Sequence, residues 1–458
     1  MFGLKKKLSL TKEEIAELLN TNPEALKAFE QAYEAAPIET DNFFKINAKQ
    51  AVDKQKELLN YSTDSNELVE QVVKELVSKT VLWSFDGTKI NTTLNINPPF
   101  SYITNDDLKN LPLEDRPMLT GNLLKCDLEP GTTSSALLFN YKQYKNAKNV
   151  KDKTMYYNLF RQGLDILDLD ALTYEMLSMN PNSMGYWLPN IIDSVLQQGF
   201  FKVPKTTIIK VPITLLQLTR LEFTSLNAIT LKIVDEYCKQ VFSLDLNGDY
   251  FIKTGTYSSK FDFRNAHVTT PKEINELGEY LLYIHYQANM MAGPLSQPSI
   301  YGVSTTNEWV VREFIPDKEN NGCIYHGLPL HTEYRVFVDF DTKEILGISP
   351  YWESNIMKKR FNQDNQDADM LHDYISFTRM ENVMMTRYNE HKDLIVNKVS
   401  ELLYNSNLTG QWSIDIMQND TDFWLIDMAL ASQSALKDCI PKNKLKPVIE
   451  NWLPNIKE

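Results

Sequence analysis

The chain has 458 residues, of which 43% are hydrophobic and 23% charged, values typical of a folded protein with roughly two or three domains. The 60 acidic and 47 basic side chains give a net charge of −13. This balance argues against a large phosphate-binding surface, so nucleic acid ranks low among the candidate partners. The apolar runs are too short for a membrane-spanning helix, and we expect no membrane partner.

The cysteines and the first residues indicate the compartment. The four cysteines lie far apart and form no CxxC pair, which argues against a zinc site or a disulfide framework. The basic start MFGLKKKLSL is not followed by the apolar segment of a secretory signal. We therefore expect a cytoplasmic protein. Neither GxGxxG nor GxxxxGK[ST] occurs, so a nucleotide site would have to use a different phosphate-binding motif.

The first part of the chain, residues 1–80, is predicted to be mainly helical. Thr11 to Glu14 has the form of a capping box, Asn22-Pro23-Glu24 begins another helix, and Val69 to Leu76 carries apolar residues at helical spacing. Residues 81–200 are expected to form a mixed connecting or accessory domain, with strands at 81–85 and 92–96 and helices from about 155 to 198.

The rest of the chain alternates strands and helices, and we divide it into lobes at 201–315 and 316–458. Consecutive strands joined by short polar turns favour antiparallel pairing, so the predicted fold class is α+β. The predicted strands are 207–211, 249–254, 309–315, 333–339, 344–348, 412–417 and 423–428, and the predicted helices are 226–241, 271–291 and 368–403.

Two strands around a turn at 419–422 carry the most informative pair of residues. Alternation is expected to place Trp424 and Ile426 in the core and to leave Asp415 and Asp427 together on the opposite face, which requires an odd-numbered loop. Like charges across a sheet repel, so the pair needs a cation, and carboxylates are ligands that Mg²⁺ commonly uses. Solvated aspartates on an exposed sheet face are the alternative.

Cationic and hydroxyl side chains form a second candidate group. Lys253 lies on a strand that leads into the loop Thr256 to Lys260, whose composition suits a phosphate cradle but also an ordinary turn. Arg312 and Glu313 interrupt an apolar strand and are expected to face a ligand or one another.

A later strand carries Glu333 and Arg335 on one face. A guanidinium there can clamp a phosphate bidentately, or it can form a plain salt bridge across the sheet. The six histidines show no metal-binding spacing, and neither GxSxG nor HExxH occurs.

The order of these motifs resembles the ATP-grasp superfamily, and more narrowly the branch related to the eukaryotic cell-division-cycle 123 proteins and their bacterial and phage relatives. The resemblance covers about residues 201–440. It rests on the segments VPKTTIIKVP (203–212), YFIKTGTYSSKFDFRNAHV (250–268), VVREFIP (310–316), EYRVFVDFDTKEILGISPYW (333–352) and WSIDIMQNDTDFWLIDMA (412–429).

The resemblance implies an ATP site with Mg²⁺ between two α+β lobes with antiparallel sheets. Arg335 would reach the γ-phosphate or a phosphorylated intermediate, and Lys260 would join it in catalysis from the Thr256 to Lys260 loop, which would close over the triphosphate. Glu313 to Ile315 would form the hinge that holds adenine and ribose, and Asp415 and Asp427 would hold the metal. The residues that would contact the nucleotide are Lys210, Lys253, Thr256, Ser258, Ser259, Lys260, Arg312, Glu313, Phe314, Ile315 and Glu333. The family often has Asn two residues after its second metal carboxylate, where this chain has Ala429, with Ser432 or Gln433 as nearby substitutes.

Three functions fit these features. The first is an ATP- and Mg²⁺-dependent enzyme, either a carboxylate–amine or carboxylate–thiol ligase acting through an acyl phosphate or a phosphotransferase, on an unknown small-molecule or protein acceptor. The second is an ATP-binding assembly factor for a protein complex, as the resemblance to cell-division-cycle 123 proteins implies, with the helical N-terminal region as its docking module. A nucleotidyltransferase ranks third because we find no Kx[DN]G lysine. The likeness to phage proteins would place the chain in a bacterial host cytoplasm.

Overall fold

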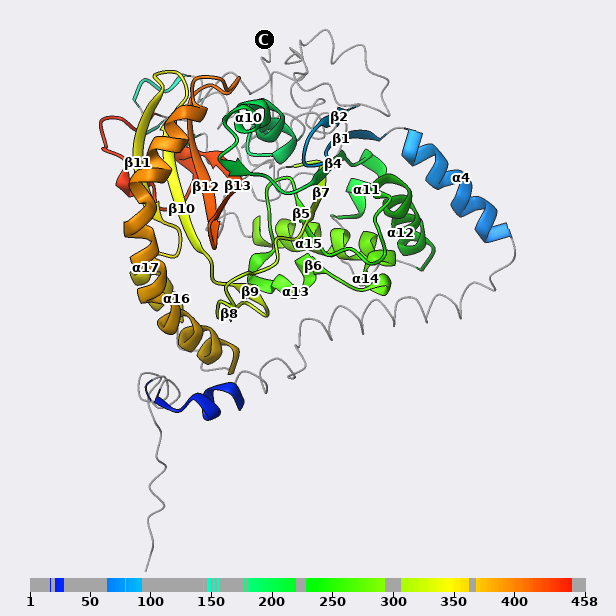
Figure 1. Ribbon diagram of the computed structural model, residues 1–458. Coiled ribbons are helices and arrows are strands. Elements are labelled where there is room, and N and C mark those ends of the chain that lie inside the picture. Colours follow the sequence, from blue (N-terminus) through cyan, green and yellow to red (C-terminus); the bar gives the residue numbers. More distant parts are fainter. Residues whose placement is uncertain are drawn as a thin grey trace, which may run out of the picture.

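The computed structural model describes residues 17, 21–28, 64–78, 80–92, 143, 146–149, 151–152, 155–156, 177, 180–219, 228–292, 306–361 and 368–446. The predicted helix that starts at Thr11, the end of the predicted strand at 92–96 and most of the predicted helical stretch from 155 to 178 lie outside these ranges. The described part is an α+β protein built on two mainly antiparallel sheets, which confirms the predicted fold class (Figure 1).

The first sheet has six strands in the order β2-β1-β4-β7-β5-β6, and all neighbours are antiparallel. Strand β7 is central, and its neighbours β4 and β5 carry the predicted phosphate lysines. The strands are β1 (Val81–Phe85), β2 (Ile90–Thr92), β4 (Thr206–Lys210), β5 (Tyr250–Thr254), β6 (His267–Val268) and β7 (Glu308–Glu313).

Helices cover one face of this sheet. The apolar face of α12 packs on α4 and α15 over a core that includes Val73, Val234, Leu281 and Trp309. The short helix α14 begins with the capping box Thr270–Glu273, in which each side chain accepts a hydrogen bond from the backbone N–H of the other residue. The helices of this lobe are α4 (Asp64–Ser78), α11 (Ile213–Leu218), α12 (Ala228–Phe242), α13 (Phe263–Ala266), α14 (Pro271–Asn275) and α15 (Leu277–Ala292), with the 3₁₀ turn η3 (Lys260–Asp262).

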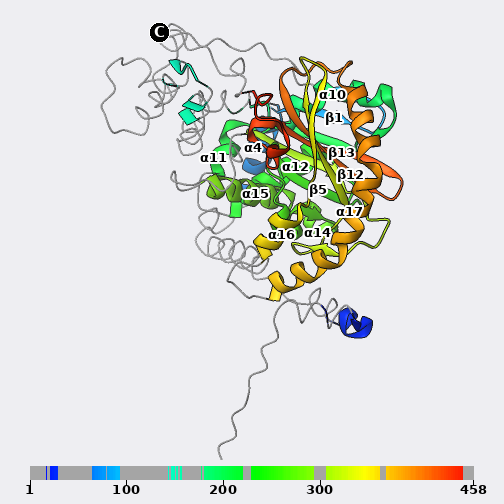
Figure 2. The ribbon, with the colours of Figure 1, turned by 90° about the vertical axis from the view of Figure 1, so that its left-hand side faces the viewer.

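The second sheet has five strands in the order β11-β10-β12-β13-β3, antiparallel except for the parallel pair β13–β3. The long helix α17 runs alongside it (Figure 2) and contacts β10 and β11. The strands are β3 (Phe201–Lys202), β10 (Thr332–Asp339), β11 (Glu344–Pro350), β12 (Gln411–Asn419) and β13 (Asp422–Leu430), beside the hairpin β8 (Cys323–Ile324) and β9 (Leu328–Pro329). The remaining elements are α16 (Ser354–Phe361), α17 (Ala368–Leu402), η4 (Ala431–Gln433) and η5 (Lys437–Cys439).

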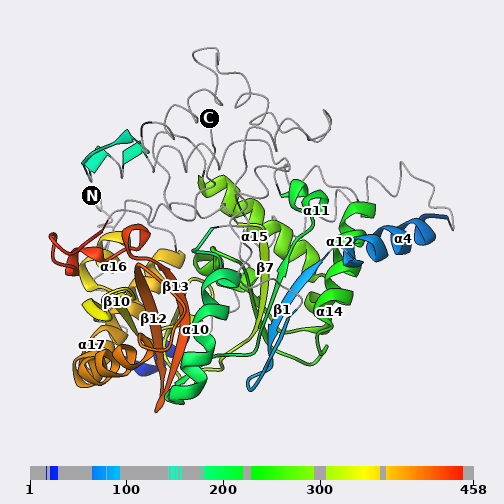
Figure 3. The same ribbon diagram turned by 90° about the horizontal axis from the view of Figure 1, so that it is seen from above.

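Helix α10 (Met184–Gln198) lies between the two sheets (Figure 3) and joins them into one core. Trp187 and Ile191 of α10 belong to a buried cluster that includes Ile208 of the first sheet and Ile414 of the second. The helix ends at Gly199, whose φ of 67° suits glycine and whose N–H donates to the carbonyl of Val195. Because one core serves both sheets, the two lobes hold a defined relative position.

Two short segments differ from the expected domain boundaries. Strands β1 and β2 fall within 81–200, yet they complete the first sheet because β1 pairs with β4 over its whole length. Strand β3 falls within 201–315, yet Phe201 and Lys202 pair with β13 of the second sheet. Strand partners far away in the sequence decide both placements.

The β12–β13 hairpin places Asp415 opposite Asp427, as predicted, but by a different route. Asn419 pairs with Asp422 across a two-residue turn, so the predicted odd-numbered loop is wrong. A β-bulge at Ile426 supplies the extra residue instead. Before the bulge Leu425 rather than Trp424 faces the core, and Ile426 itself lies toward the cleft between the sheets, so the core placement of Trp424 and Ile426 is also wrong.

No helix among the described residues is both long enough and apolar enough to cross a membrane.

Asp235 of α12 and Glu279 of α15 form an acidic pair between two helices of the first lobe. Gly278 allows this approach, because a Cβ there would lie 2.6 Å from the backbone of Val234. The N–H of Glu279 donates to Oδ1 of Asp235 at 3.0 Å. Burial, reinforced by the nearby Glu276 carboxylate, raises the pKa of Glu279 to about 7. A carboxyl with a raised folded-state pKa contributes stability below its ordinary pKa and loses that contribution as the pH rises through the folded value.

We predict that Glu279→Gln makes the free energy of unfolding less dependent on pH. The amide keeps a neutral group at every pH, so the loss of stability that the wild type suffers as the pH rises through about 7 should shrink by about 1–2 kcal/mol. Urea unfolding at several pH values measures this. Glu236→Gln on α12, whose side chain is 41% exposed, is the control, and a Glu279→Gln variant as pH-dependent as the wild type would contradict the assignment.

Candidate functional site

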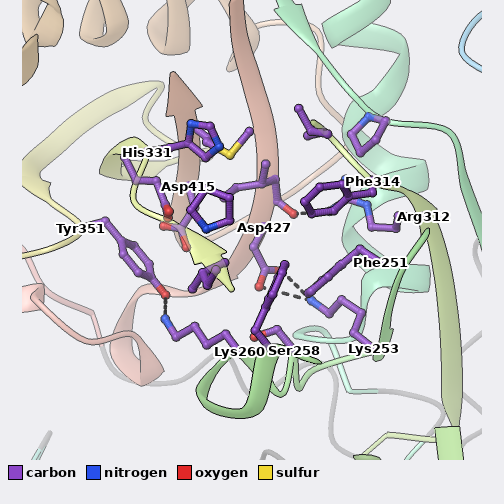
Figure 4. Close-up of a pocket in the computed structure, with 18 of the residues that line it drawn as sticks. Phe251, Lys253, Ser258, Lys260, Arg312, Phe314, His331, Tyr351, Asp415 and Asp427 are labelled. Atoms are coloured by element: carbon purple, nitrogen blue, oxygen red, sulfur yellow. Dashed lines mark hydrogen bonds and ion pairs between the residues drawn. The ribbon is translucent and has the colours of Figure 1, made fainter. Parts of the chain in front are cut away.

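A cleft between the two sheets collects most of the residues singled out from the sequence (Figure 4). One wall comes from β5, β7 and the loop after β5, and the other comes from β10, β12 and β13. The predicted residues that line it are Lys253, Ser258, Lys260, Arg312, Glu313, Phe314, Ile315, Glu333, Asp415 and Asp427. The two lobes therefore bring segments from Lys253 to Asp427 together in one site.

The second sheet contributes a row of charged side chains on one face. Arg335 pairs with Asp415 across β10 and β12, and Asp415 pairs with Asp427 across β12 and β13. The Arg335 guanidinium donates from Nε and Nη2 to the two carboxylate oxygens of Asp415 at 2.8 and 2.7 Å. Burial works against the charge of Arg335, but Asp415 outweighs it and the pKa of Arg335 lies above its ordinary value. The predicted salt bridge across the sheet exists, and its partner is Asp415 rather than Glu333.

The first sheet contributes two buried cations. Nζ of Lys253, a residue only 2% exposed, lies 3.3 Å from both carboxylate oxygens of Asp427. Burial lowers the pKa of Lys253, while Asp427 opposes that shift. Arg312 donates from Nε to the Thr206 hydroxyl at 3.2 Å and from Nη1 to the carbonyl of Ile426 at 2.6 Å.

One donor of Arg312 is left over. Its Nη2 is buried and has no hydrogen-bond partner, although the residue is 4% exposed and lines the cleft. Burial lowers the pKa of Arg312 to about 10. A buried donor without a partner carries a desolvation cost, and a ligand acceptor in the cleft would remove it.

The loop after β5 carries Lys260 to the edge of the cleft. Its ammonium lies 4.2 Å from the ring centre of Tyr351 and 5.2 Å from that of Trp352, and it also contacts the Tyr351 hydroxyl. Ser259 precedes it with a φ of 47°, a left-handed conformation that turns the chain. Cation–π contacts with two rings hold Lys260 at the same end of the cleft as Asp415 (Figure 4).

Glu333 is a buried carboxyl in the wall of the cleft. The Trp352 indole donates to its Oε1 at 3.1 Å. Burial raises the pKa of Glu333 to about 7, against the opposing effect of Lys260. The side chain therefore changes protonation near neutral pH and can accept or release a proton there.

The opposite end of the cleft is apolar and lies at the predicted hinge. Phe251, Phe263 and Phe314 come together there, with ring centres of Phe251 and Phe263 5.9 Å apart. The N–H groups of Glu313 and Phe314 donate to the carbonyls of Lys205 and Asp249, which fixes the hinge backbone. This end has the flat, aromatic character of a site for a planar ring.

Four predicted site residues, three of them nucleotide contacts, do not line the cleft. Lys210 lies on β4 opposite Glu308, a buried carboxyl that accepts a hydrogen bond from the N–H of Gly185 at 2.9 Å. Ser259 is buried and donates its hydroxyl to Gln287, and the N–H of Thr256 donates to the Thr254 hydroxyl. The hydrogen bond to helix α15 holds the Ser259 side chain away from the cleft, and Thr256 is half-buried outside the cleft lining.

The fourth, Arg335, reaches the site through its ion pair with Asp415 and stacks 4.6 Å from the Tyr351 ring centre. Sequence reasoning assigned no role to His331, Tyr351 or Trp352, which all line the cleft. The Tyr-Trp pair directly after β11 was visible as a motif, whereas nothing in the sequence linked His331 to this cleft.

Among the residues that the structure describes, two groups of carboxylate or histidine side chains could hold a cation. Asp415 and Asp427 face each other at the end of the cleft near Lys260, and their donor set suits Mg²⁺. Asp317, Glu319 and His331 lie close enough to share an ion, but Asp317 already accepts from the backbone of Glu319 and Glu319 pairs with Arg387. Gln433, an alternative ligand near Ala429, accepts a hydrogen bond from Asn182 instead.

No family model matches the sequence, and no curated protein matches it. Two solved structures of Cdc123 from Schizosaccharomyces pombe are similar to this chain. The C-terminally truncated form is 14% identical, covers 60% of this chain and 95% of its own, and has a TM-score of 0.32. The other form is 13% identical, covers 59% of this chain and 95% of its own, and has a TM-score of 0.34.

We predict that Glu333 titrates with a midpoint near pH 7 and that Trp352 reports it. Ionisation strengthens the hydrogen bond from the indole, so part of the tryptophan fluorescence should change across that midpoint and be absent in Glu333→Gln. A fluorescence titration of both proteins measures the difference. Glu313→Gln, whose side chain is 51% exposed, should titrate like the wild type. An unchanged titration in Glu333→Gln would contradict the assignment.

Proposed function

We propose that this chain binds ATP together with Mg²⁺ in the cleft between its two sheets. The observation that carries the proposal is the facing pair Asp415 and Asp427, set in one cleft with Lys253 and Lys260. Carboxylates are suitable Mg²⁺ ligands, and ammonium groups complement the charge of a triphosphate. A solvated surface aspartate is a poor description of Asp415, which is 4% exposed and bonded to Arg335, and Asp427 is 37% exposed but paired with Lys253.

The residues at the other end of the cleft favour the binding of a purine base. The aromatic rings of Phe251, Phe263 and Phe314 offer apolar walls, and the buried Nη2 of Arg312 offers a donor for a base, ribose or phosphate oxygen. The order of motifs along the chain resembles ATP-grasp proteins, in which the nucleotide lies between two lobes. Geometry and motif order thus point to the same ligand.

In this proposal each charged group has a separate task. Asp415 and Asp427 would hold Mg²⁺, which when bound neutralises and orients phosphate oxygens. Lys253 and Lys260 would contact phosphates from the wall formed by β5 and the loop after it, and burial of Lys253 increases the strength of its electrostatic interaction. Glu333, with its pKa near 7, can move a proton at the same end of the cleft.

We predict that Asp427→Asn weakens Mg²⁺-dependent ATP binding at least tenfold. ATP with Mg²⁺ at about 100 times its Kd should stabilise the wild type by about 2.7 kcal/mol, which thermal unfolding or calorimetry detects. Asp422→Asn is the matched control, since it lies on the same strand and pairs with Lys202 and Lys318 outside the cleft. Equal affinities in Asp427→Asn and the wild type would place the nucleotide elsewhere.

Two uses of the nucleotide follow from the resemblance. An ATP-binding assembly factor would bind ATP while acting as a chaperone for a protein complex, as the resemblance to the cell-division-cycle 123 proteins implies. A ligase or phosphotransferase would transfer a phosphoryl group to an acceptor, and Glu333 is the group in the cleft with a pKa suited to proton transfer. We favour the assembly factor because the narrower resemblance points to it.

Turnover separates the two uses. A ligase or phosphotransferase should release ADP when its acceptor is present, and Asp415→Asn should lower that rate by about 10²-fold or more because the phosphoryl charge loses its support. An assembly factor should bind ATP tightly, release little ADP across panels of amine, thiol and carboxylate acceptors, and lose partner binding in Asp415→Asn. ADP release measured by a coupled assay decides between them, and acceptor-dependent turnover would overturn our preference.

A further inference from the structure

Four charged side chains form one continuous row across the cleft. Arg335, Asp415 and Asp427 occupy facing positions on β10, β12 and β13, and Lys253 reaches Asp427 from the first sheet. The two carboxylates and the two cationic side chains thus neutralise one another, and all four groups belong to the protein. The following inference rests on the proposed function and concerns which form of the metal this row accepts.

The two ion pairs differ in strength. The Arg335–Asp415 pair has two parallel hydrogen bonds of 2.8 and 2.7 Å, and the side chains are only 12% and 6% exposed. The Lys253–Asp427 pair has one nitrogen 3.3 Å from each oxygen, and Asp427 is 37% exposed. A buried bidentate guanidinium pair is among the strongest charged contacts, so Asp415 is the more firmly occupied carboxylate.

Arg335 is also fixed from its other sides. Its guanidinium stacks 4.6 Å from the ring centre of Tyr351, and its Nη1 lies 3.4 Å from the carbonyl of Ala435. Directly opposite positions on β10 and β12 keep it beside Asp415. It can release the carboxylate only if another anion takes over its donors, because an unpaired buried guanidinium is costly.

We propose that Arg335 makes this site select a metal–nucleoside triphosphate complex over the free divalent cation. A free cation must displace the guanidinium from Asp415 and leave it without an anion. A metal–triphosphate complex brings its own phosphate oxygens, so the guanidinium exchanges one bidentate anion for another while Asp415 turns to the metal. Metal and nucleotide therefore bind with positive coupling, and Arg335 is the residue that creates it.

The test uses Mn²⁺ as a probe of the full-length protein, with protein-bound Mn²⁺ measured by equilibrium dialysis, because the nucleotide analogue itself binds Mn²⁺ in solution. The wild type is expected to bind Mn²⁺ alone weakly and to bind it at least tenfold more tightly with a non-hydrolysable ATP analogue. Arg335→Gln is expected to bind Mn²⁺ alone at least tenfold more tightly than the wild type. Arg335→Lys keeps the positive charge but loses the bidentate guanidinium group, so its affinity for free Mn²⁺ should lie between those of the wild type and Arg335→Gln.

Two controls tie the gain to Asp415. The double variant Arg335→Gln with Asp415→Asn should lose the gain in affinity for free Mn²⁺ that Arg335→Gln alone shows. Lys446→Gln removes an equal charge from another ion pair on the same sheet, where Nζ lies 2.7 Å from the 3% exposed side chain of Asp339, and it should bind Mn²⁺ like the wild type. Near-ultraviolet circular dichroism checks that each variant is folded.

Wild type and Arg335→Gln with equal affinity for free Mn²⁺ would overturn the inference, as would a gain that persists in the double variant. Either result leaves the proposed function intact if the wild type still binds Mn²⁺ with the analogue. Loss of all binding with the analogue, together with a gain for free Mn²⁺ in Arg335→Gln, would sink the proposed function while the competition between Arg335 and the metal stands.

Discussion

Asp415 and Asp427 face each other across β12 and β13, and their mutual repulsion is the constraint that the surrounding structure satisfies. Like charges on facing strand positions destabilise a sheet unless cations compensate them. Arg335 compensates from the neighbouring strand, and Lys253 compensates from the other lobe. Because one of the two cations comes from the first sheet, the charge balance of the second sheet depends on how the lobes are joined.

The contact that joins the two lobes is apolar. Helix α10 packs against both sheets, and its first turn is held by the buried carboxyl of Glu308, which accepts from the N–H of Gly185. Gly255 follows β5 at a point where a Cβ would lie 2.6 Å from Glu308, so the loop that carries Lys260 passes close to the same carboxyl. A rigid apolar core thus sets the distances between groups whose interactions are electrostatic, which is how a site keeps its charges preorganised.

The buried charged residues of the site also lower the stability of the folded protein. Lys253 and Arg312 are almost fully buried, and burial lowers the pKa of both. Glu333 is raised toward neutrality for the same reason. Buried charges gain no net stability over a well-packed apolar core, so a ligand that needs them gives a physical reason for keeping them in the cleft. The unpartnered Nη2 of Arg312 belongs to the same pattern.

The sequence by itself determined the fold class and most strands and helices of the second half, because alternation along a strand is a local property, and it singled out Asp415 and Asp427 as a pair. It placed Lys253, Lys260, Arg312 and Glu333 in one site through motif order alone. Only the tertiary structure decided that a bulge at Ile426, and not an odd loop, sets the register, and that Lys210 faces Glu308. It also decided that Arg335 binds Asp415 rather than lining the cleft, since pairing between strands distant in sequence follows from packing and not from local pattern.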